Sequence, residues 1–391
     1  MKILAIETSC DETAVALLEC NGGFSDAKFT ILGNSLDSQA EKHAEYGGVY
    51  PTLAKREHQT NLAPLASSVL KQANMARENK KIDTMIYHSA NIRDDAFKKS
   101  IADFLSAYAK PDIDLIAVTH GPGLEPALWT GINFAEALSK TWGVPLFGID
   151  HMEGHLVSAL LSSVPREKDD IDPYTLKQFS FPLLSLLISG GHTELILMKE
   201  WFVYERIGAT KDDALGEAFD KVARLLDLPY PGGPHIAAAA TRSRERGGTD
   251  ITFPRPMLND NTCDFSFSGL KTAVLYKLRA MEKISEEDKE AIAQAFEDAA
   301  RDTVVSKTLR AIDQTHPAAL VLGGGVSANA EIRHAIEKRV HERNPDVAVL
   351  LPEWELTGDN GIMIGAAAYL RHLSGKESDT ELQALGSLVL Q

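Results

Sequence analysis

Short apolar runs that alternate with polar turns recur along this chain, and the first of them predicts a β-hairpin. Residues 3–18 consist of an apolar run, a turn rich in hydroxyl and carboxylate groups, and a second apolar run. This order is typical of two antiparallel strands joined by a turn. Residues 183–198 repeat it, with a threonine ahead of the second apolar run. The repeat predicts an internal duplication, although unrelated hairpins also share this outline.

A second pattern predicts parallel strands. Residues 115–119 are apolar and lead into a Gly-Pro-Gly turn at 121–123. A helix is expected at about 126–142, and a further short buried strand at 145–150. A strand, a helix and a second strand in this order form a βαβ unit, whose two strands are parallel.

Segments with helical patterning fill much of the remaining chain. Helices are expected at about 52–70, 212–226 and 285–313, and another from about residue 330. Residues 265–271 are expected to lead into a further helix that ends near residue 281. The polar stretch 74–110 is expected to be an inserted helical excursion with a solvated surface, and 164–180 a charged connection between lobes. The chain has 391 residues, too many for one hydrophobic core, so two α/β lobes are predicted.

Two histidines four residues apart predict a metal site. His151 and His155 lie on one face of the expected helix, one turn apart, and each offers an imidazole nitrogen. Asp150 before them suits the N-cap position. Asp359, within a Gly-Asp-Asn sequence, is the best third ligand, and packed or surface histidines are the simpler alternative. A metalloprotease is excluded because Met152 stands where such enzymes carry glutamate.

A glycine-rich junction follows the apolar run 319–322. Gly323, Gly324 and Gly325 precede a helix, and exposed N–H groups at a helix N-terminus bind phosphate or other anions. The junction matches neither a Walker A loop nor the Rossmann glycine pattern. Asn329 is expected either to contact a ribose or to cap the helix. A tight turn without any ligand is the alternative.

Composition limits the partners. Forty basic residues against 55 acidic ones give a net charge of −15, which opposes nonspecific binding to nucleic acids. A polyanionic partner would therefore need a local basic patch or a helper protein. Two small clusters qualify, the segment 242–246 with three arginines and a helix bearing Lys271, Lys277 and Arg279, although an ordinary solvated face explains each equally well.

Cysteines and the N-terminus indicate a reducing compartment. The three cysteines are widely spaced and include no Cys-x-x-Cys pair. The chain enters a strand at once, with neither a signal-peptide pattern nor an apolar run long enough to span a membrane. We therefore expect a cytoplasmic protein without membrane attachment.

Sequence motifs of one protein family occur in that family's order along nearly the whole chain. The matching stretches are residues 6–13, 47–49, 56–58, 121–124, 151–155, 189–193, 216–221, 230–234, 267–271, 323–329 and 358–360. Together they resemble the universal tRNA threonylcarbamoyladenosine synthase family, called TsaD in bacteria. The resemblance is to its bacterial and mitochondrial branch.

The resemblance implies an α/β fold of the actin and sugar-kinase type, with two RNase H-like lobes and a nucleotide cleft between them. The N-terminal lobe is expected to comprise residues 1–155 plus about 360–391, and the C-terminal lobe residues 156–359. The implied reaction moves a threonylcarbamoyl group from threonylcarbamoyl-adenylate to N6 of the adenosine 3′ of the anticodon, in tRNAs that read codons beginning with A. AMP is released, and a metal assists.

The resemblance also implies roles for individual residues. His151, His155 and Asp359 match the ligands of one divalent metal per subunit, with Fe²⁺ favoured and Zn²⁺ the alternative. Asp11 and Glu12 match an acidic turn that faces the reacting centre, and either is a candidate base. The substrate-contacting positions are Leu187, Ile188, Ser189, Gly190, Gly191, Asp220, Gly233, Gly324 and Asn329. The implied partners are tRNA and either the degenerate paralogue TsaB with the ATPase TsaE, or a second copy of the chain.

Two alternatives and one departure accompany this resemblance. Leu187 occupies the position of a tyrosine metal ligand in the archaeal and eukaryotic cytosolic branch. An ATP-dependent kinase or ATPase of the same fold would carry Asp-x-Gly-x-Thr in its first turn, and residues 7–13 contain no glycine. A non-catalytic scaffold like the paralogue would lack the histidine pair and the second lobe, both of which this chain has.

Overall fold

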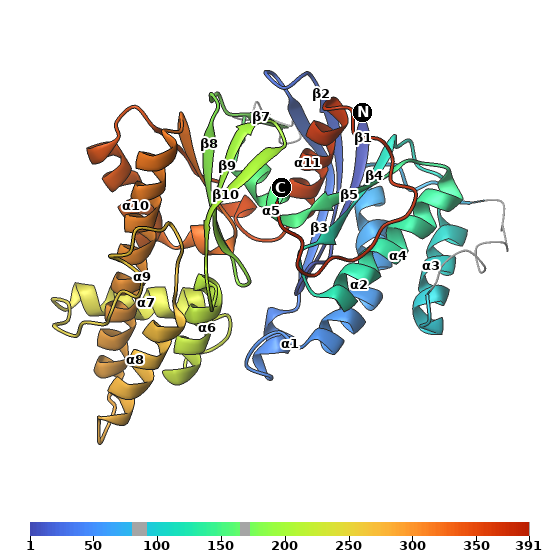
Figure 1. Cartoon of the computed structure of the whole chain (residues 1–391). Helices are drawn as coiled ribbons and strands as arrows, with labels where there is room; N and C mark the ends of the chain where they lie inside the picture. Colours follow the sequence, from blue (N-terminus) through green and yellow to red (C-terminus); the bar gives the residue numbers. More distant parts are fainter. Residues whose placement is uncertain (80–91, 165–172, 391) are drawn as a thin grey trace. The chain divides into compact units, whose positions relative to one another are not determined.

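The computed structural model describes residues 1–79, 92–164 and 173–390, which form two compact units. The first unit comprises Met1–Ala40, Val49–Gln178 and Gly358–Val389. The second comprises Glu41–Gly48, Phe179–Thr357 and Leu390–Gln391. Figure 1 shows the ribbon coloured along the sequence, with a mixed sheet in each unit.

The first unit is built on a seven-stranded sheet. Its strands are β1 (Lys2–Glu7), β2 (Glu12–Asn21), β3 (Lys28–Ser38), β4 (Leu115–Gly121), β5 (Leu146–Asp150), β6 (Leu161–Ser163) and β7 (Pro173–Leu176). They follow the order β5-β4-β1-β2-β3-β7-β6. β1, β2 and β3 are antiparallel neighbours, whereas β1, β4 and β5 are parallel. The predicted hairpin and the predicted βαβ unit are therefore both confirmed.

Helices cover both faces of this sheet (Figure 1). One face carries α2 (Pro51–Gln72), α3 (Asp95–Ala107) and α4 (Glu125–Trp142), and the other α5 (His151–Ala159) and α11 (Gly361–Leu373). Side chains alternate along β1, so Leu4 and Ile6 enter the core under α2 and α4, whereas Ala5 faces α11. A Cβ atom on Gly365 would lie 2.6 Å from Leu18, so glycine allows α11 its close approach to the sheet.

The second unit repeats the core of the first. Its strands are β8 (Leu183–Ile188), β9 (Thr193–Glu200), β10 (Val203–Ala209), β11 (Ala319–Gly323) and β12 (Ala348–Leu350), in the order β10-β9-β8-β11-β12. Numbered by appearance, both units follow the order 3-2-1-4-5 with the same strand directions. A shared order of five strands goes beyond a shared hairpin and supports the predicted duplication. Two RNase H-like lobes are thus the fold class, as predicted.

A helical layer packs against one face of the second sheet. It includes α6 (Leu215–Leu225), α7 (Gly232–Glu245), α8 (Ser268–Arg279), α9 (Glu286–Thr315) and α10 (Ala330–Arg343), and short elements are α1 (Ala40–Ala44) and the 3₁₀ helices η2 (Gly325–Ala328) and η3 (Trp354–Leu356). Phe219 of α6 and Phe296 of α9 meet edge to face, with ring centroids 5.0 Å apart, inside this core. The long helix α9 starts where predicted, because Ser285 and Asp288 form a reciprocal capping box.

One lobe boundary and the character of one helix differ from the predictions. The first unit runs past residue 155 to Gln178, because β7 pairs with β3 and β6 pairs with β7. Within 74–110, α3 is amphipathic rather than a purely solvated excursion, and its Phe97, Ile101 and Phe104 enter the core. Residues 80–91 and 165–172, which belong to the two polar stretches, lie outside the described residues.

The described part of the chain contains no helix with the length and apolarity that crossing a membrane requires.

Candidate active site

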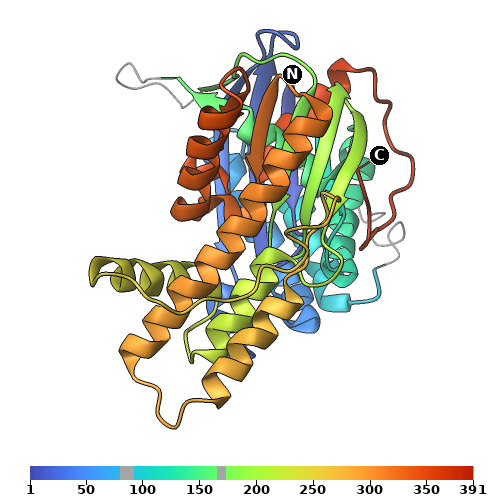
Figure 2. The ribbon, with the colours of Figure 1, turned by 60° about the vertical axis from the view of Figure 1, so that its left-hand side comes forward.

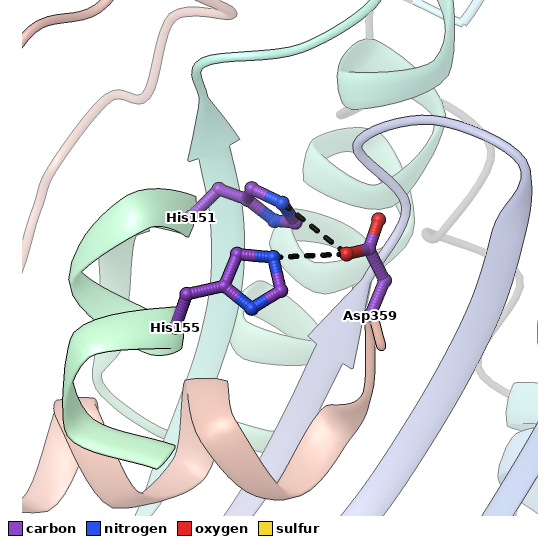
Figure 3. A group of neighbouring side chains, drawn as sticks. All are labelled: His151, His155 and Asp359. Atoms are coloured by element: carbon purple, nitrogen blue, oxygen red, sulfur yellow. Dashed lines mark ion pairs between the residues drawn. The ribbon is translucent and has the colours of Figure 1, made fainter. Parts of the chain in front are cut away.

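The three predicted metal ligands lie together in the first unit. Asp150 caps α5 by accepting hydrogen bonds from the N–H groups of Met152 and Glu153, which places His151 and His155 one turn apart (Figure 3). Asp359 stands just ahead of α11. Its Oδ1 lies 3.4 Å from Nε2 of His151 and 3.1 Å from Nε2 of His155. One ligand atom from each residue falls within 4.8 Å of the others, so the group could hold a metal ion.

The environment of His155 fits a metal better than simple packing. Its side chain is fully buried, and within the described residues neither ring nitrogen has a hydrogen-bond partner, since the approach of Asp359 does not have hydrogen-bond geometry. Buried polar atoms without partners are rare, and an ion is one of the explanations for them. Two imidazoles and one carboxylate are also a ligand set that leaves positions open for substrate.

The charges of His151 and Asp359 shift each other's pKa. Burial by itself lowers the pKa of His151, but the carboxylates of Asp359 and Glu7 outweigh it and raise that pKa well above its ordinary value. Burial raises the pKa of Asp359, and the two neighbouring imidazoles more than reverse this, leaving its pKa far below the ordinary value. An anionic Asp359 at neutral pH is the form that binds a cation.

Glu7, at the end of β1, orients His151. Its fully buried carboxylate accepts hydrogen bonds from Ser9 N and Thr119 Oγ1, both at 2.5 Å, and lies 3.0 Å from Nδ1 of His151. A carboxylate can only accept, so Nδ1 carries the proton and Nε2 keeps its lone pair for a metal. Such a carboxylate–histidine pair is the usual support of a metal-binding imidazole. The sequence did not reveal this role of Glu7, although Glu7 lies within the matching stretch 6–13.

An ion pair joins the two helices that carry the ligands. Glu153 lies between the histidines on α5, is buried, and accepts hydrogen bonds of 2.9 and 3.1 Å from Nε of Arg371 on α11. Breaking a buried pair by removing one partner costs about 3–5 kcal/mol. The pair therefore holds α5 against the helix that follows Asp359. The sequence shows that Glu153 lies between the two histidines, but nothing in it indicates that Glu153 pairs with Arg371.

The acidic turn lies in the same unit. His58 of α2 is buried and holds this turn, with Nε2 donating to Cys10 O at 3.0 Å and Nδ1 lying 2.7 Å from Thr13 Oγ1. Burial, followed by the charges of Asp11 and Asp359, raises the pKa of Glu12 well above its ordinary value. A carboxyl group with a raised pKa is suited to exchanging protons near neutral pH. The structure thus brings the acidic turn within electrostatic reach of Asp359, one of the three candidate metal ligands.

The nine predicted substrate-contacting residues all lie in the second unit, around the carboxyl ends of β8 and β11. These strands are parallel neighbours, with Gly323 opposite Leu187, so residues 187–191 and 323–325 meet at one edge. The start of α6 joins them, since Gly216 N donates to Ser189 O. Asp220 of α6 accepts a 2.7 Å hydrogen bond from Gly232 N, which ties α7 to the same edge. Ligands in open α/β sheets bind outside the carboxyl ends of strands.

The glycines at this edge fall into two classes. A Cβ atom added to Gly190, Gly191, Gly233 or Gly325 would meet nothing within 4 Å. At Gly324, whose φ is +86°, it would lie 2.5 Å from Ile188 O. The first four therefore leave backbone open for a ligand, whereas Gly324 is required by packing and by its left-handed backbone.

One expectation at the glycine junction is wrong, and the helix-capping alternative for Asn329 is confirmed. The glycines do not open α10, because η2 intervenes and Asn329 caps the helix by accepting from Ile332 N at 2.9 Å. Asn329 Nδ2 also donates to Glu297 Oε1 at 2.7 Å, so its side chain serves the protein itself. Leu187 and Ile188 are fully buried, which leaves only their backbone groups for a substrate.

Substituting Gly325 by valine is expected to weaken binding of the adenylate donor that the sequence analysis predicts by at least tenfold, without loss of fold, because its side chain would occupy open space beside the backbone. Calorimetric titration with a non-hydrolysable analogue of the adenylate donor measures the effect. Gly324→Val is the contrasting variant, and its melting temperature should fall because Cβ meets the Ile188 carbonyl. Unchanged donor affinity in a folded Gly325→Val protein would contradict the placement of the donor.

Known proteins resemble this chain over nearly its whole length. A family model described as TsaD, tRNA N6-adenosine threonylcarbamoyltransferase, matches residues 30–89 and 87–366. A protein of that name from Nitrosomonas europaea is 39% identical over 392 residues, covering 100% of this chain and 98% of the relative. One from Burkholderia mallei is 40% identical over 379 residues, covering 95% of this chain and 92% of the relative.

A solved structure resembles the fold more distantly. Full-length HypF, crystallised in a phosphate- and nucleotide-bound form, matches with a TM-score of 0.52 and 10% identity. The match covers 97% of this chain and 47% of HypF, and at this identity it concerns the fold alone. The family match and the full-length relatives are decisive, and the chain belongs to the tRNA N6-adenosine threonylcarbamoyltransferase family.

Proposed function

We propose that this protein transfers a threonylcarbamoyl group from threonylcarbamoyl-adenylate to N6 of the adenosine 3′ of the anticodon in tRNAs reading codons that begin with A. Its membership of the family over the whole chain is the observation that carries this proposal. The local geometry adds support, since the first unit holds a metal-type group beside an acidic turn, and the second presents open backbone for a ligand.

The reaction sets two requirements. The donor is a mixed carbamic–phosphoric anhydride, so AMP leaves readily once the carbonyl carbon is attacked. The exocyclic amine of adenine is a poor nucleophile, because its lone pair is delocalised into the ring. A new bond forms between N6 and the carbonyl carbon, the bond from that carbon to the phosphate oxygen breaks, and N6 loses a proton. The protein must therefore hold the reactants together and accept that proton.

Residues of the first unit would activate the carbonyl group and accept the proton from N6. His151, His155 and Asp359 would hold one divalent ion, Fe²⁺ or Zn²⁺, which polarises a carbonyl or phosphate oxygen when bound. Glu12, whose pKa is raised by burial and by the charges of Asp11 and Asp359, and Asp11 beside it are the two candidates for accepting the proton.

Residues of the second unit would hold the donor. The open glycines Gly190, Gly191, Gly233 and Gly325 would admit phosphate and ribose against backbone N–H groups. The side chain of Asp220 supports this edge through Gly232 rather than reaching outward itself. We further propose that the protein works with the degenerate paralogue TsaB and the ATPase TsaE, or as a homodimer.

A reconstituted reaction tests the function. The protein, an adenylate-forming enzyme, threonine, bicarbonate, ATP and an unmodified tRNA that reads ANN codons are combined, with and without the proposed partner proteins. Mass spectrometry of the digested tRNA should detect threonylcarbamoyladenosine, and a transcript with guanosine at the target position should yield none. Phosphorylation of a small molecule in place of tRNA modification would instead indicate a kinase of the same fold.

A further inference from the structure

The three arginines of the segment 242–246 are occupied within the second unit. Arg244 binds Glu297 at 2.7 Å and Asp298 at 2.8 Å. Arg242 and Arg246 both bind Glu290. All three acids belong to α9, so these arginines attach α7 to α9. Their charge is neutralised where it lies, which removes the segment as a surface for a polyanion.

The arginines of a groove between α9 and α10 are neutralised in the same way. It encloses about 550 Å³ and is lined by Arg301, Arg339 and Arg343 among other residues. Arg301 binds Asp298, Asp302 and Glu331. Arg339 and Arg343 bind Glu342 and Asp313 respectively. The guanidinium groups of this groove are thus already paired with carboxylates.

The end of α8 is different. Leu270, Val274 and Leu278 are spaced four apart and bury one side of the helix, so the opposite side faces solvent. We call four exposed residues the α8 surface, namely Tyr276, Lys277, Arg279 and, just beyond the helix, Lys283. Thr272, Ala280 and Glu282 are exposed beside them. Figures 1 and 2 show the α8–α9 connection at one end of the second unit.

The cations of the α8 surface are unpaired. Across residues 1–79, 92–164 and 173–390, neither Lys277, Arg279 nor Lys283 makes an ion pair. Nearby acids are Glu282, Glu286, Glu287 and Asp288. Glu286 binds Lys289 at 3.0 Å, and Asp288, whose pKa the charge of Lys277 helps to lower, accepts from Ser285 N at 2.9 Å and from Ser285 Oγ at 2.7 Å. Cations also complement the dipole at a helix C-terminus, but that does not account for Tyr276, whose bulky ring is 64% exposed.

We propose that the α8 surface binds the tRNA, with Lys277, Arg279 and Lys283 on backbone phosphates and Tyr276 stacked on an unpaired base. Unpaired cations beside an exposed aromatic ring are the combination that single-stranded and looped nucleic acids bind. A chain with net charge −15 needs either such a local surface or a helper protein to bind a polyanion. This inference rests on the proposed function, which makes tRNA the substrate.

The triple variant Lys277→Glu, Arg279→Glu, Lys283→Glu tests the surface. Fluorescence anisotropy with a labelled tRNA transcript should show at least a tenfold higher Kd for the full-length variant near 50 mM salt. The slope of log K against log salt concentration should become shallower by about 2–3, because roughly 0.7–0.9 is lost per phosphate contact. Metal content and donor affinity should stay unchanged. Tyr276→Ala should also weaken binding severalfold, whereas Tyr276→Phe should retain it, since stacking needs only the ring.

The matched control reverses the same number of charges elsewhere in the unit, at Lys338, Arg339 and Arg343 of the groove. Binding that weakens equally in both triple variants, or only in the control, would overturn the proposal. The wild-type protein separates this from the proposed function. If it modifies no tRNA in the reconstituted reaction, the proposed function fails. If it modifies tRNA while the α8 variant keeps wild-type Kd and KM for tRNA, the surface assignment alone fails.

Discussion

Replacing His151 and His155 together by alanine is expected to abolish stoichiometric metal binding and to lower activity by roughly 10³-fold or more, the equivalent of several kcal/mol of transition-state stabilisation. Asp359 would remain as a single carboxylate, and one carboxylate does not retain a transition metal that two imidazoles and a carboxylate hold together. The fold should survive, because α5 keeps its Asp150 cap and its Glu153–Arg371 ion pair. Elemental analysis of the purified protein and its thermal melting curve measure both effects.

A variant without His334 and His341 is the matched control. Both side chains are exposed on α10 in the second unit, so it removes two imidazoles without touching the group around Asp359. This control should retain one equivalent of metal and full activity. One equivalent of tightly bound metal in the His151/His155 double variant would show that the metal lies elsewhere.

Glu7→Gln is expected to weaken metal binding by about 10- to 100-fold, the usual effect of removing a group that supports a metal-binding histidine. The carboxylate accepts from Ser9 N, Thr119 Oγ1 and His151 Nδ1. A glutamine of the same size must direct its NH₂ group at one of these donors. If the NH₂ group faces His151, Nδ1 becomes an acceptor and the proton moves to Nε2, the atom that a metal needs. Competition with a chelator measures the dissociation constant of the metal.

The pH dependence of metal binding distinguishes a role of Glu7 in orienting His151 from a general loss of structure. Glu7 helps to raise the pKa of His151, and below that pKa protons compete with the metal. Removing the negative charge lowers the pKa, so in Glu7→Gln the decline of metal affinity on acidification should begin at a lower pH, although the maximal affinity is smaller. Glu19→Gln, on the neighbouring strand β2, should change neither quantity. A metal dissociation constant in Glu7→Gln equal to that of the wild type would exclude the orienting role.

Local features could be predicted from the sequence because they depend on residues close together in the chain. The hairpin of β1 and β2, the βαβ unit of β4, α4 and β5, and the cap of α5 by Asp150 each follow from turn chemistry and hydrophobic period within about twenty residues. Spacing alone also placed His151 and His155 on one side of a helix. Asp359 was identified as their partner by its motif, and the structure brings it next to them.

Interactions between distant segments were decided by tertiary packing. Nothing local links Glu153 to Arg371, 218 positions away, or Glu7 to His151, 144 positions away, and both pairs arise because β1, α5 and α11 pack together. The sequence likewise could not distinguish arginines that α9 neutralises from the cations of α8 that stay unpaired. Whether a charged or polar side chain is occupied or available depends on what the folded chain places opposite it, and that partner is set by packing rather than by neighbours in the sequence.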